Sequence, residues 1–156
     1  MGDLWFFRRK KKETDVKNYP VKSISYDEIR DAIREYGKTL PNNVPLGVII
    51  KDNLEIDYQL LSPFLKAVPK ERYYMSKETY EIFTKEEKHI AEAMDMVQRA
   101  VDRYVDIKKE LPVIDDDPYR KVSYHKLEQL QLLEERPPID FYITNEEYLI
   151  TRQKPN

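Results

Sequence analysis

The sequence predicts an α+β fold in which a long central helix and two or three shorter helices pack on antiparallel β-hairpins. Capping boxes at residues 25–28 and 84–87 each precede a segment with apolar residues at helical spacing. Elsewhere, short runs rich in tyrosine, isoleucine and valine have the composition of half-buried strands. The chain has 156 residues, of which 40% are apolar, and this suffices for one ordinary domain with a core.

The first helix is expected over residues 26–36. Ser25 is its predicted N-cap, which accepts a hydrogen bond from the Glu28 amide while the Glu28 side chain reaches back to the Ser25 amide. Its predicted inner face consists of Ile29, Ile33 and Tyr36. Gly37 is predicted to end the helix in a left-handed conformation, which glycine adopts without a steric penalty.

A β-hairpin is expected over residues 47–58. The apolar run at residues 48–50 predicts its first strand, and the alternating apolar residues of 54–58 predict its second. The Lys-Asp-Asn sequence at residues 51–53 is typical of a turn between them.

The longest predicted element is a helix over residues 85–110, opened by the Thr84–Glu87 capping box and stopped by Leu111-Pro112. Its predicted apolar stripe consists of Ala93, Val97, Ala100, Tyr104, Ile107 and Leu111, widened by Ile90, Met94 and Val101. The pattern lasts less than three heptads and is broad, which favours a central core helix over the alternative of a coiled-coil partner.

Two shorter helices are expected as well. One covers residues 60–68 and is entered through Ser62-Pro63, since proline suits the first turn of a helix. The other covers residues 124–135, is capped by Ser123 and is ended by the two prolines that follow Arg136. Its predicted inner face consists of Leu127, Leu130 and Leu133.

Two segments, residues 73–82 and 141–150, share the order aromatic, Tyr, aliphatic, hydroxyl, any residue, Glu, any residue, Tyr, any residue, Ile. They predict related hairpins near residues 72–83 and 139–151 that pack against the long helix. Four-residue loops would give the pairs Met75–Tyr80, Tyr73–Ile82, Ile143–Tyr148 and Phe141–Ile150. Chance similarity, or a short helix capped by Ser76 in the first copy, remain as alternatives.

An apolar run followed by a basic run stands at the start of the chain. The candidate membrane- or partner-binding residues are Trp5, Phe6, Phe7, Arg8, Arg9, Lys10, Lys11 and Lys12. The first twelve residues hold five cations and one carboxylate, Asp3, so they carry +4. Because the whole chain carries −2, the rest of it must carry −6. Residues 1–19 are therefore predicted to form a mobile basic and aromatic N-terminal arm, and residues 20–153 a single α+β domain; an arm folded back on the acidic body is the alternative.

Several classes of function are disfavoured by composition. The chain has no cysteine and three glycines, which excludes thiol chemistry, cysteine zinc sites and the glycine-rich loops that cradle nucleotide phosphates. No apolar stretch is long enough to span a bilayer, and the apolar run precedes the basic run, the reverse of a secretory signal. A myristoylation signal needs Ser or Thr where Phe6 stands.

Catalytic, cofactor and metal sites are not predicted. Glu86 and His89 have the Glu-x-x-His spacing of di-iron bundles, but the residue three before the other histidine, His125, is Val122. The acidic run of residues 115–117 lacks the alternate ligand spacing of an EF-hand and predicts a solvated turn. No serine has the flanking glycines of a nucleophile elbow.

The final third of the chain resembles a known group of proteins. Residues 121–151, with their Leu-rich helix, Glu135-Arg136-Pro137-Pro138 and the Phe-Tyr-Ile-Thr sequence at 141–144, are similar to small uncharacterised proteins of Bacillus-type bacteria. The resemblance implies a cytosolic bacterial setting and no functional residue.

We therefore expect a non-catalytic cytosolic protein that docks reversibly, at the inner face of the membrane, on anionic lipid or on a protein partner. The contact would run through the aromatic and basic residues of the arm, because such residues suit the headgroup boundary and anionic lipid. The alternatives are an RNA-, ribosome- or DNA-associated factor that uses the same arm, and an enzyme of an unrecognised class. No cofactor is expected, and the sequence does not determine an oligomeric state.

Overall fold

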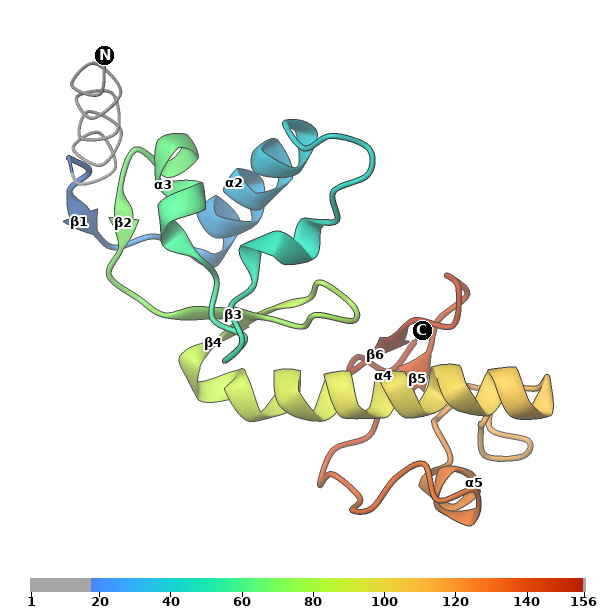
Figure 1. Ribbon diagram of the computed structural model, residues 1–156. Helices are drawn as coiled ribbons and strands as arrows, with labels where there is room; N and C mark the ends of the chain where they lie inside the picture. Colours follow the sequence, from blue (N-terminus) through green and yellow to red (C-terminus); the bar gives the residue numbers. More distant parts are fainter. Residues whose placement is uncertain (1–17, 156) are drawn as a thin grey trace. The chain divides into compact units, whose positions relative to one another are not determined.

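The computed structural model describes residues 18–155, and Figure 1 shows the elements that they form. The predicted α+β class is confirmed: helices, one of them long, are combined with short antiparallel strand pairs. The chain divides into two compact units, unit 1 (Met1–Tyr74) and unit 2 (Met75–Asn156), which are described separately. The single domain predicted over residues 20–153 stays a prediction.

In its described part, residues 18–74, unit 1 contains two helices, one 3-10 turn and a short parallel strand pair. In chain order its elements are β1 (Val21–Lys22), α2 (Tyr26–Lys38), η1 (Leu46–Ile49), α3 (Tyr58–Leu65) and β2 (Val68–Pro69). The strands β1 and β2 pair in parallel, with Val21 opposite Val68. Helices α2 and α3 pack together, and the rings of Tyr36 and Phe64 meet edge to face at 6.0 Å. β3 (Tyr73–Met75) begins at the end of this unit, and its last residue, Met75, is the first residue of unit 2.

Helix α2 confirms the helix predicted at this place and extends it by two residues. The Ser25 side chain accepts a hydrogen bond from the Glu28 amide at 3.2 Å, as predicted. The Glu28 carboxylate, however, accepts a hydrogen bond from the Ser25 hydroxyl, where the prediction had the Ser25 amide as the donor. The prediction for Gly37 is wrong, because Gly37 lies inside the helix and has no positive φ. The helix ends instead at Lys38, and its C-cap is Thr39, whose amide donates to carbonyls of the last turn.

The hairpin predicted over residues 47–58 is present only at its turn, and the predicted first strand is wrong. Its first strand is largely replaced by the 3-10 turn η1, and an isolated bridge between Ile50 and Ile56 is what remains of the pairing. The predicted turn at 51–53 is present, closed by the Leu54 amide and the Lys51 carbonyl at 2.9 Å. Leu54 has φ 73°, a conformation that interrupts a regular strand.

Helix α3 begins earlier than predicted. Asp57 is its N-cap, accepting from the Gln59 amide at 3.1 Å, and Pro63 lies inside the helix rather than in its first turn. Lys66 ends the helix in a left-handed conformation, so residues 66–68 of the predicted helix are not helical.

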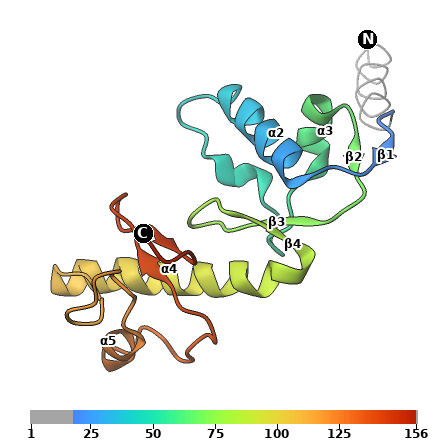
Figure 2. The same ribbon diagram turned by 180° about the vertical axis from the view of Figure 1, so that it is seen from behind.

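Unit 2 is organised around one long helix. Its elements are β4 (Ile82–Thr84), η2 (Lys85–Glu87), α4 (Lys88–Lys108), α5 (Tyr124–Gln129), β5 (Tyr142–Ile143) and β6 (Ile150–Thr151). Figures 1 and 2 show β5 and β6 on one side of α4 and α5 on the other. The capping box of Thr84 and Glu87 is confirmed at the start of the helical segment. None of the helices in the described part of the chain is long and apolar enough to cross a membrane.

The buried face of α4 differs in detail from the predicted stripe. Ile107, one residue before the end of the helix at Lys108, is 54% exposed rather than part of the buried face. Two polar residues, Asp95 and Gln98, are buried at 4% and 2% exposure beside Met94 and Val101. Sequence reasoning did not place them in the core.

The helix predicted over residues 124–135 is shorter than expected. Ser123 caps α5 by accepting from the Lys126 amide at 3.2 Å, which confirms the start of the helix. The regular helix stops at Gln129, because the left-handed Gln131 turns the chain and the Leu132 amide bonds back to the Leu127 carbonyl at 3.0 Å. Leu127 and Leu133 are buried, and Leu130 is half-buried.

The similarity between residues 73–82 and 141–150 corresponds to two similar hairpins. The Ser76 amide donates to the Glu81 carbonyl at 2.9 Å, and the equivalent Thr144 amide donates to the Leu149 carbonyl at 2.8 Å. The equivalent residues Tyr80 and Tyr148 both have positive φ, 63° and 65°.

The predicted register of these hairpins is wrong by two residues. In the second hairpin Ile143 pairs with Ile150 and Tyr142 with Thr151, in place of Ile143 with Tyr148. A left-handed tyrosine in each loop cannot continue a strand, so each loop is longer than the four residues assumed.

Candidate functional site

The binding residues predicted from the sequence, residues 5–12, lie outside the described residues. Most of the residues weighed and set aside for metal chemistry are solvent-exposed: Glu86, His89, His125, Asp115 and Asp116. Asp117 is half-buried. Among residues 18–155, no group of three or more His, Asp or Glu side chains is arranged to hold a metal ion.

Asp95 holds the loop of the first hairpin against α4. Its Oδ1 accepts from the Ser76 hydroxyl at 2.5 Å and from the Glu78 amide at 3.2 Å, while its Oδ2 accepts from the Lys77 amide at 3.1 Å. Ser76 is itself fully buried. A buried carboxylate is costly unless it is hydrogen-bonded. These three donors meet that requirement and fix the loop.

Gln98, one turn further along the helix, holds the second hairpin. Its Oε1 accepts from the Ile150 amide at 2.8 Å, and its Nε2 donates to the Tyr148 carbonyl at 3.0 Å. An amide side chain supplies the acceptor and the donor that these two backbone groups need. One helix face thus anchors two hairpins through two buried polar side chains.

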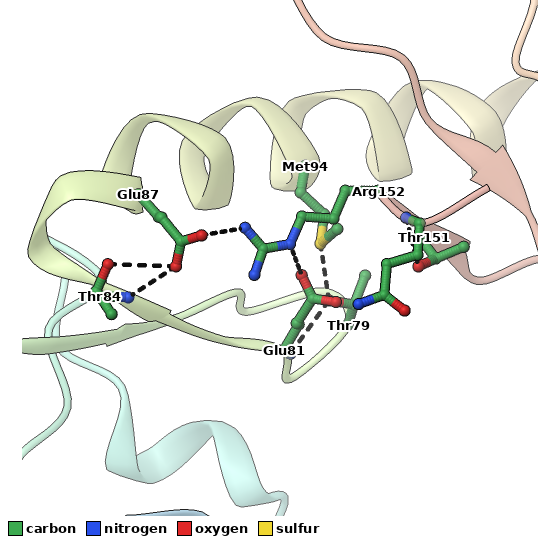
Figure 3. Close-up of polar contacts among 8 residues, drawn as sticks. Thr79, Glu81, Thr84, Glu87, Met94, Thr151 and Arg152 are labelled. Carbon is green, nitrogen blue, oxygen red and sulfur yellow. Dashed lines mark hydrogen bonds and ion pairs between the residues drawn. The ribbon is translucent and has the colours of Figure 1, made fainter. Parts of the chain in front are cut away.

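Arg152 connects the end of the second hairpin to β4 and the start of the helix (Figure 3). Its Nη1 donates to Glu87 Oε2 at 2.5 Å, and its Nε lies 3.4 Å from Glu81 Oε2. Its Cζ lies 4.7 Å from the centre of the Phe83 ring, which adds a cation–π contact. Glu87 also accepts from the amide and hydroxyl of Thr84. We call Arg152, Glu81, Glu87 and Thr84 the Arg152 clasp.

The two carboxylates of the clasp differ in acidity. Burial raises the pKa of Glu81, and the nearby Glu87 raises it further, although Arg152 opposes both. Burial alone would also raise the pKa of Glu87, but hydrogen bonds from Arg152 and Thr84 outweigh it and lower that pKa. Glu87 is thus the carboxylate that the arginine stabilises in its charged form.

A cavity of about 500 Å³ lies beside the second hairpin in unit 2. Its lining includes Tyr119, Arg120, Thr144, Asn145, Thr151 and Lys154. Thr151 and Gln153 line the cavity while Arg152 between them joins the clasp, which fits the alternation of side chains along an extended segment. The clasp therefore fixes one wall of the cavity.

Two cations, Arg120 and Lys154, line this cavity. Arg120 Nη1 donates to Asn145 Oδ1, and Lys154 Nζ lies 4.0 Å from the centre of the Tyr119 ring. None of the described residues that line the cavity is acidic.

Sequence reasoning missed the residues of these sites. A signal existed for Gln98, because it stands on the helical line that joins Met94 to Val101, where a polar residue is unusual. For Arg120, Arg152 and Lys154 the sequence carried no comparable signal, since their neighbours in space come from distant segments.

The fold and these sites define an α+β protein in which a long helix anchors two hairpins beside a small cationic cavity. The chain belongs to the family described as Protein of unknown function (DUF3939), whose profile matches residues 19–152. The resemblance to an uncharacterised protein family is thereby confirmed, while the bacterial setting stays a prediction. No curated protein and no solved structure shows a significant match to the chain.

Proposed function

We propose that this is a non-catalytic protein that docks reversibly on an anionic membrane surface through Trp5, Phe6, Phe7 and the basic run of residues 8–12. The supporting observation within the described residues is a basic edge on unit 1, directly after the arm. It consists of Val21 and Lys22 of β1, of Lys70 beside Lys22, and of Lys66, which precedes the paired strand β2 by two residues.

The basic edge has the properties of a surface that meets lipid headgroups. Val21 is 68% exposed, and the three lysines are exposed as well. The Lys70 amide donates to the Lys22 carbonyl at 2.9 Å, which holds the segments that carry these two lysines side by side. In the described part of the chain none of these lysines forms an ion pair with a carboxylate.

The charge of the two units supports the same surface. Residues 18–74 hold eight Lys and Arg and eight Asp and Glu, so the described part of unit 1 is neutral. Residues 75–155 hold 13 cations and 18 carboxylates, so unit 2 carries the whole acidic excess of −5. The unit that continues from the arm therefore adds no net repulsion from anionic lipid.

Electrostatics and aromatic insertion would share the binding. Each cation near an anionic leaflet contributes about 1 kcal/mol, so residues 8–12 contribute at most about 5 kcal/mol before ordering costs. This predicts weak binding that salt reverses.

Co-sedimentation with vesicles tests the proposal. Full-length protein should pellet with phosphatidylserine-containing vesicles and stay in solution with pure phosphatidylcholine, and removal of residues 1–12 should abolish pelleting. Replacing Lys22, Lys66 and Lys70 with glutamine should weaken it partially. Glutamine at Lys85, Arg103 and Lys108, three exposed cations of unit 2, is the matched control and should change little. Equal pelleting of the full-length and shortened proteins would overturn the proposal.

The alternative is an RNA- or DNA-associated factor that uses the same arm. Its signature is binding to nucleic acid with a steep dependence on salt, together with indifference to vesicles. An electrophoretic shift assay run over a salt series, beside the vesicle assay, decides between the two.

A further inference from the structure

We propose that the cavity of unit 2 lined by Arg120 and Lys154 binds a small phosphate monoester. This cavity is formed by residues of unit 2 rather than by residues 5–12, so the proposal does not rest on membrane docking.

The charge around the cavity favours an anionic ligand. Unit 2 has an acidic excess, and several of its cations are paired with carboxylates, as Lys121 is with Asp140 at 3.2 Å. Arg120 and Lys154 differ, because their described partners are an amide oxygen and an aromatic ring. Arg120 is half-buried and Lys154 is exposed, so both cations face the open side of the pocket. Cations that line a pocket without a counter-charge attract an anion from solution. A ligand would supply the negative charge that the lining lacks.

The fixed position of Arg120 is the second argument. Its backbone is left-handed, with φ 60°, which is unfavourable for a residue other than glycine. Two hydrogen bonds hold it there: its amide donates to the Asp117 carbonyl at 3.3 Å, and its carbonyl accepts from the Ile143 amide at 3.0 Å. The guanidinium has five N–H donors. The bond to Asn145 occupies one nitrogen, so further donors stay available to a ligand.

The composition of the lining indicates the chemical class. A phosphate monoester carries a charge of about −1.5 to −2 at neutral pH, whereas a carboxylate carries −1. Two cations therefore match the charge of a phosphate monoester better. The Thr151 hydroxyl accepts from the Gln153 amide at 3.1 Å and keeps its own proton to donate. Pro118, Ile143 and Pro155 add apolar walls, and the volume of about 500 Å³ exceeds the need of inorganic phosphate. An organic group on the phosphate would contact these walls.

Titration calorimetry on the full-length protein tests the proposal with matched probes. AMP and glycerol phosphate should bind, whereas adenosine and glycerol, which lack the phosphate, should not. Arg120→Gln and Lys154→Gln should each weaken binding about tenfold, the loss expected for one charge-assisted contact. Arg103→Gln, which removes an exposed cation of α4 outside the cavity, is the matched control and should bind as the unaltered protein does.

Two further measurements test ligand binding separately from misfolding of the variants and from binding by the N-terminal arm. In the unaltered protein, AMP should shift the backbone amide resonances of Arg120, Asn145 and Thr151. A variant with glutamine at residues 8–12 should retain the binding. Absence of binding by both phosphorylated probes at millimolar concentration, an equal loss in Arg103→Gln, or resonance shifts confined to other residues would each overturn the proposal.

Discussion

Two hairpin loops of unit 2, residues 76–81 and 144–149, have similar backbones, but they are anchored to the long helix by different chemistry. The first is held at its loop by the Asp95 carboxylate, which accepts three hydrogen bonds. The second is held by the Gln98 amide, which donates one backbone hydrogen bond and accepts another. A loop that turns several donors toward the helix needs an acceptor with two oxygens. A hairpin that turns one carbonyl and one amide toward it needs a side chain with both functions.

The largest effect is expected from Asp95→Ala. It would leave the buried Ser76 hydroxyl and the Lys77 and Glu78 amides without their acceptor, and should lower the free energy of unfolding by about 2–4 kcal/mol. Urea denaturation measures the loss, and Asp106→Ala, at an exposed aspartate of the same helix, is the control. A loss no larger than that of the control would show that the carboxylate does not anchor the loop.

Gln98→Ala should cost less, about 1–2 kcal/mol. It removes two neutral bonds to backbone and one bond to Asp102, whose exposed carboxylate water can solvate instead, whereas Asp95→Ala removes a buried carboxylate with three bonds. Hydrogen exchange sharpens the comparison. Gln98→Ala should speed exchange at the Ile150 amide, and Asp95→Ala should speed it at the Lys77 and Glu78 amides. If either substitution increased the amide exchange rates of both hairpins equally, Asp95 and Gln98 would not anchor the two hairpins separately.

The clasp should respond to pH through one carboxylate more than the other. The folded-state pKa of Glu87 is lowered, so its contribution to stability is present above the unfolded pKa near 4.5 and disappears as pH falls through the folded value. The pKa of Glu81 is raised, so the folded protein binds that proton more tightly, and stability declines as pH rises from near 4.5 through the folded value.

Glu87→Gln should therefore lower the stability at pH 7 by about 1 kcal/mol or less and flatten the loss on acidification. Glu81→Gln, its matched partner, should leave the stability at pH 7 unchanged or slightly higher. Thermal denaturation across an acid-to-neutral series measures both, and equal losses at neutral pH would contradict the assignment of Glu87 as the stabilised carboxylate.

The smallest effect should be shared by the two hairpins. Tyr80 and Tyr148 hold left-handed backbone in equivalent positions, and both are partly exposed. Glycine removes the strain of about 1 kcal/mol but adds a similar entropy cost in the unfolded chain, so each Tyr→Gly change should alter stability by less than about 1 kcal/mol. Chemical denaturation of both variants checks this. A large loss in one of them alone would show that the two turns are not equivalent.

Features that depend on residues close together in the sequence were predicted well. The N-caps at Ser25 and Ser123 and the capping box at Thr84 depend on residues within four positions, and all three are present. The similarity between the two hairpins was likewise readable, because the same order of side chains occurs twice. The predictions were wrong where the backbone conformation of a turn residue sets the strand pairing. The left-handed tyrosines shift the register of the hairpins, and Leu54 interrupts a predicted strand.

By itself, the sequence determined the α+β class, the long helix and its start, and the charge asymmetry between the N-terminal arm and the rest of the chain. These features follow from composition and from neighbours along the chain. Tertiary structure alone decided that Asp95 and Gln98 are buried, that Arg152 joins Glu81 to Glu87, and that Arg120 and Lys154 line one cavity. The physical reason is that a buried polar group is acceptable only where distant backbone and side chains supply its partners, and sequence spacing does not encode those distances.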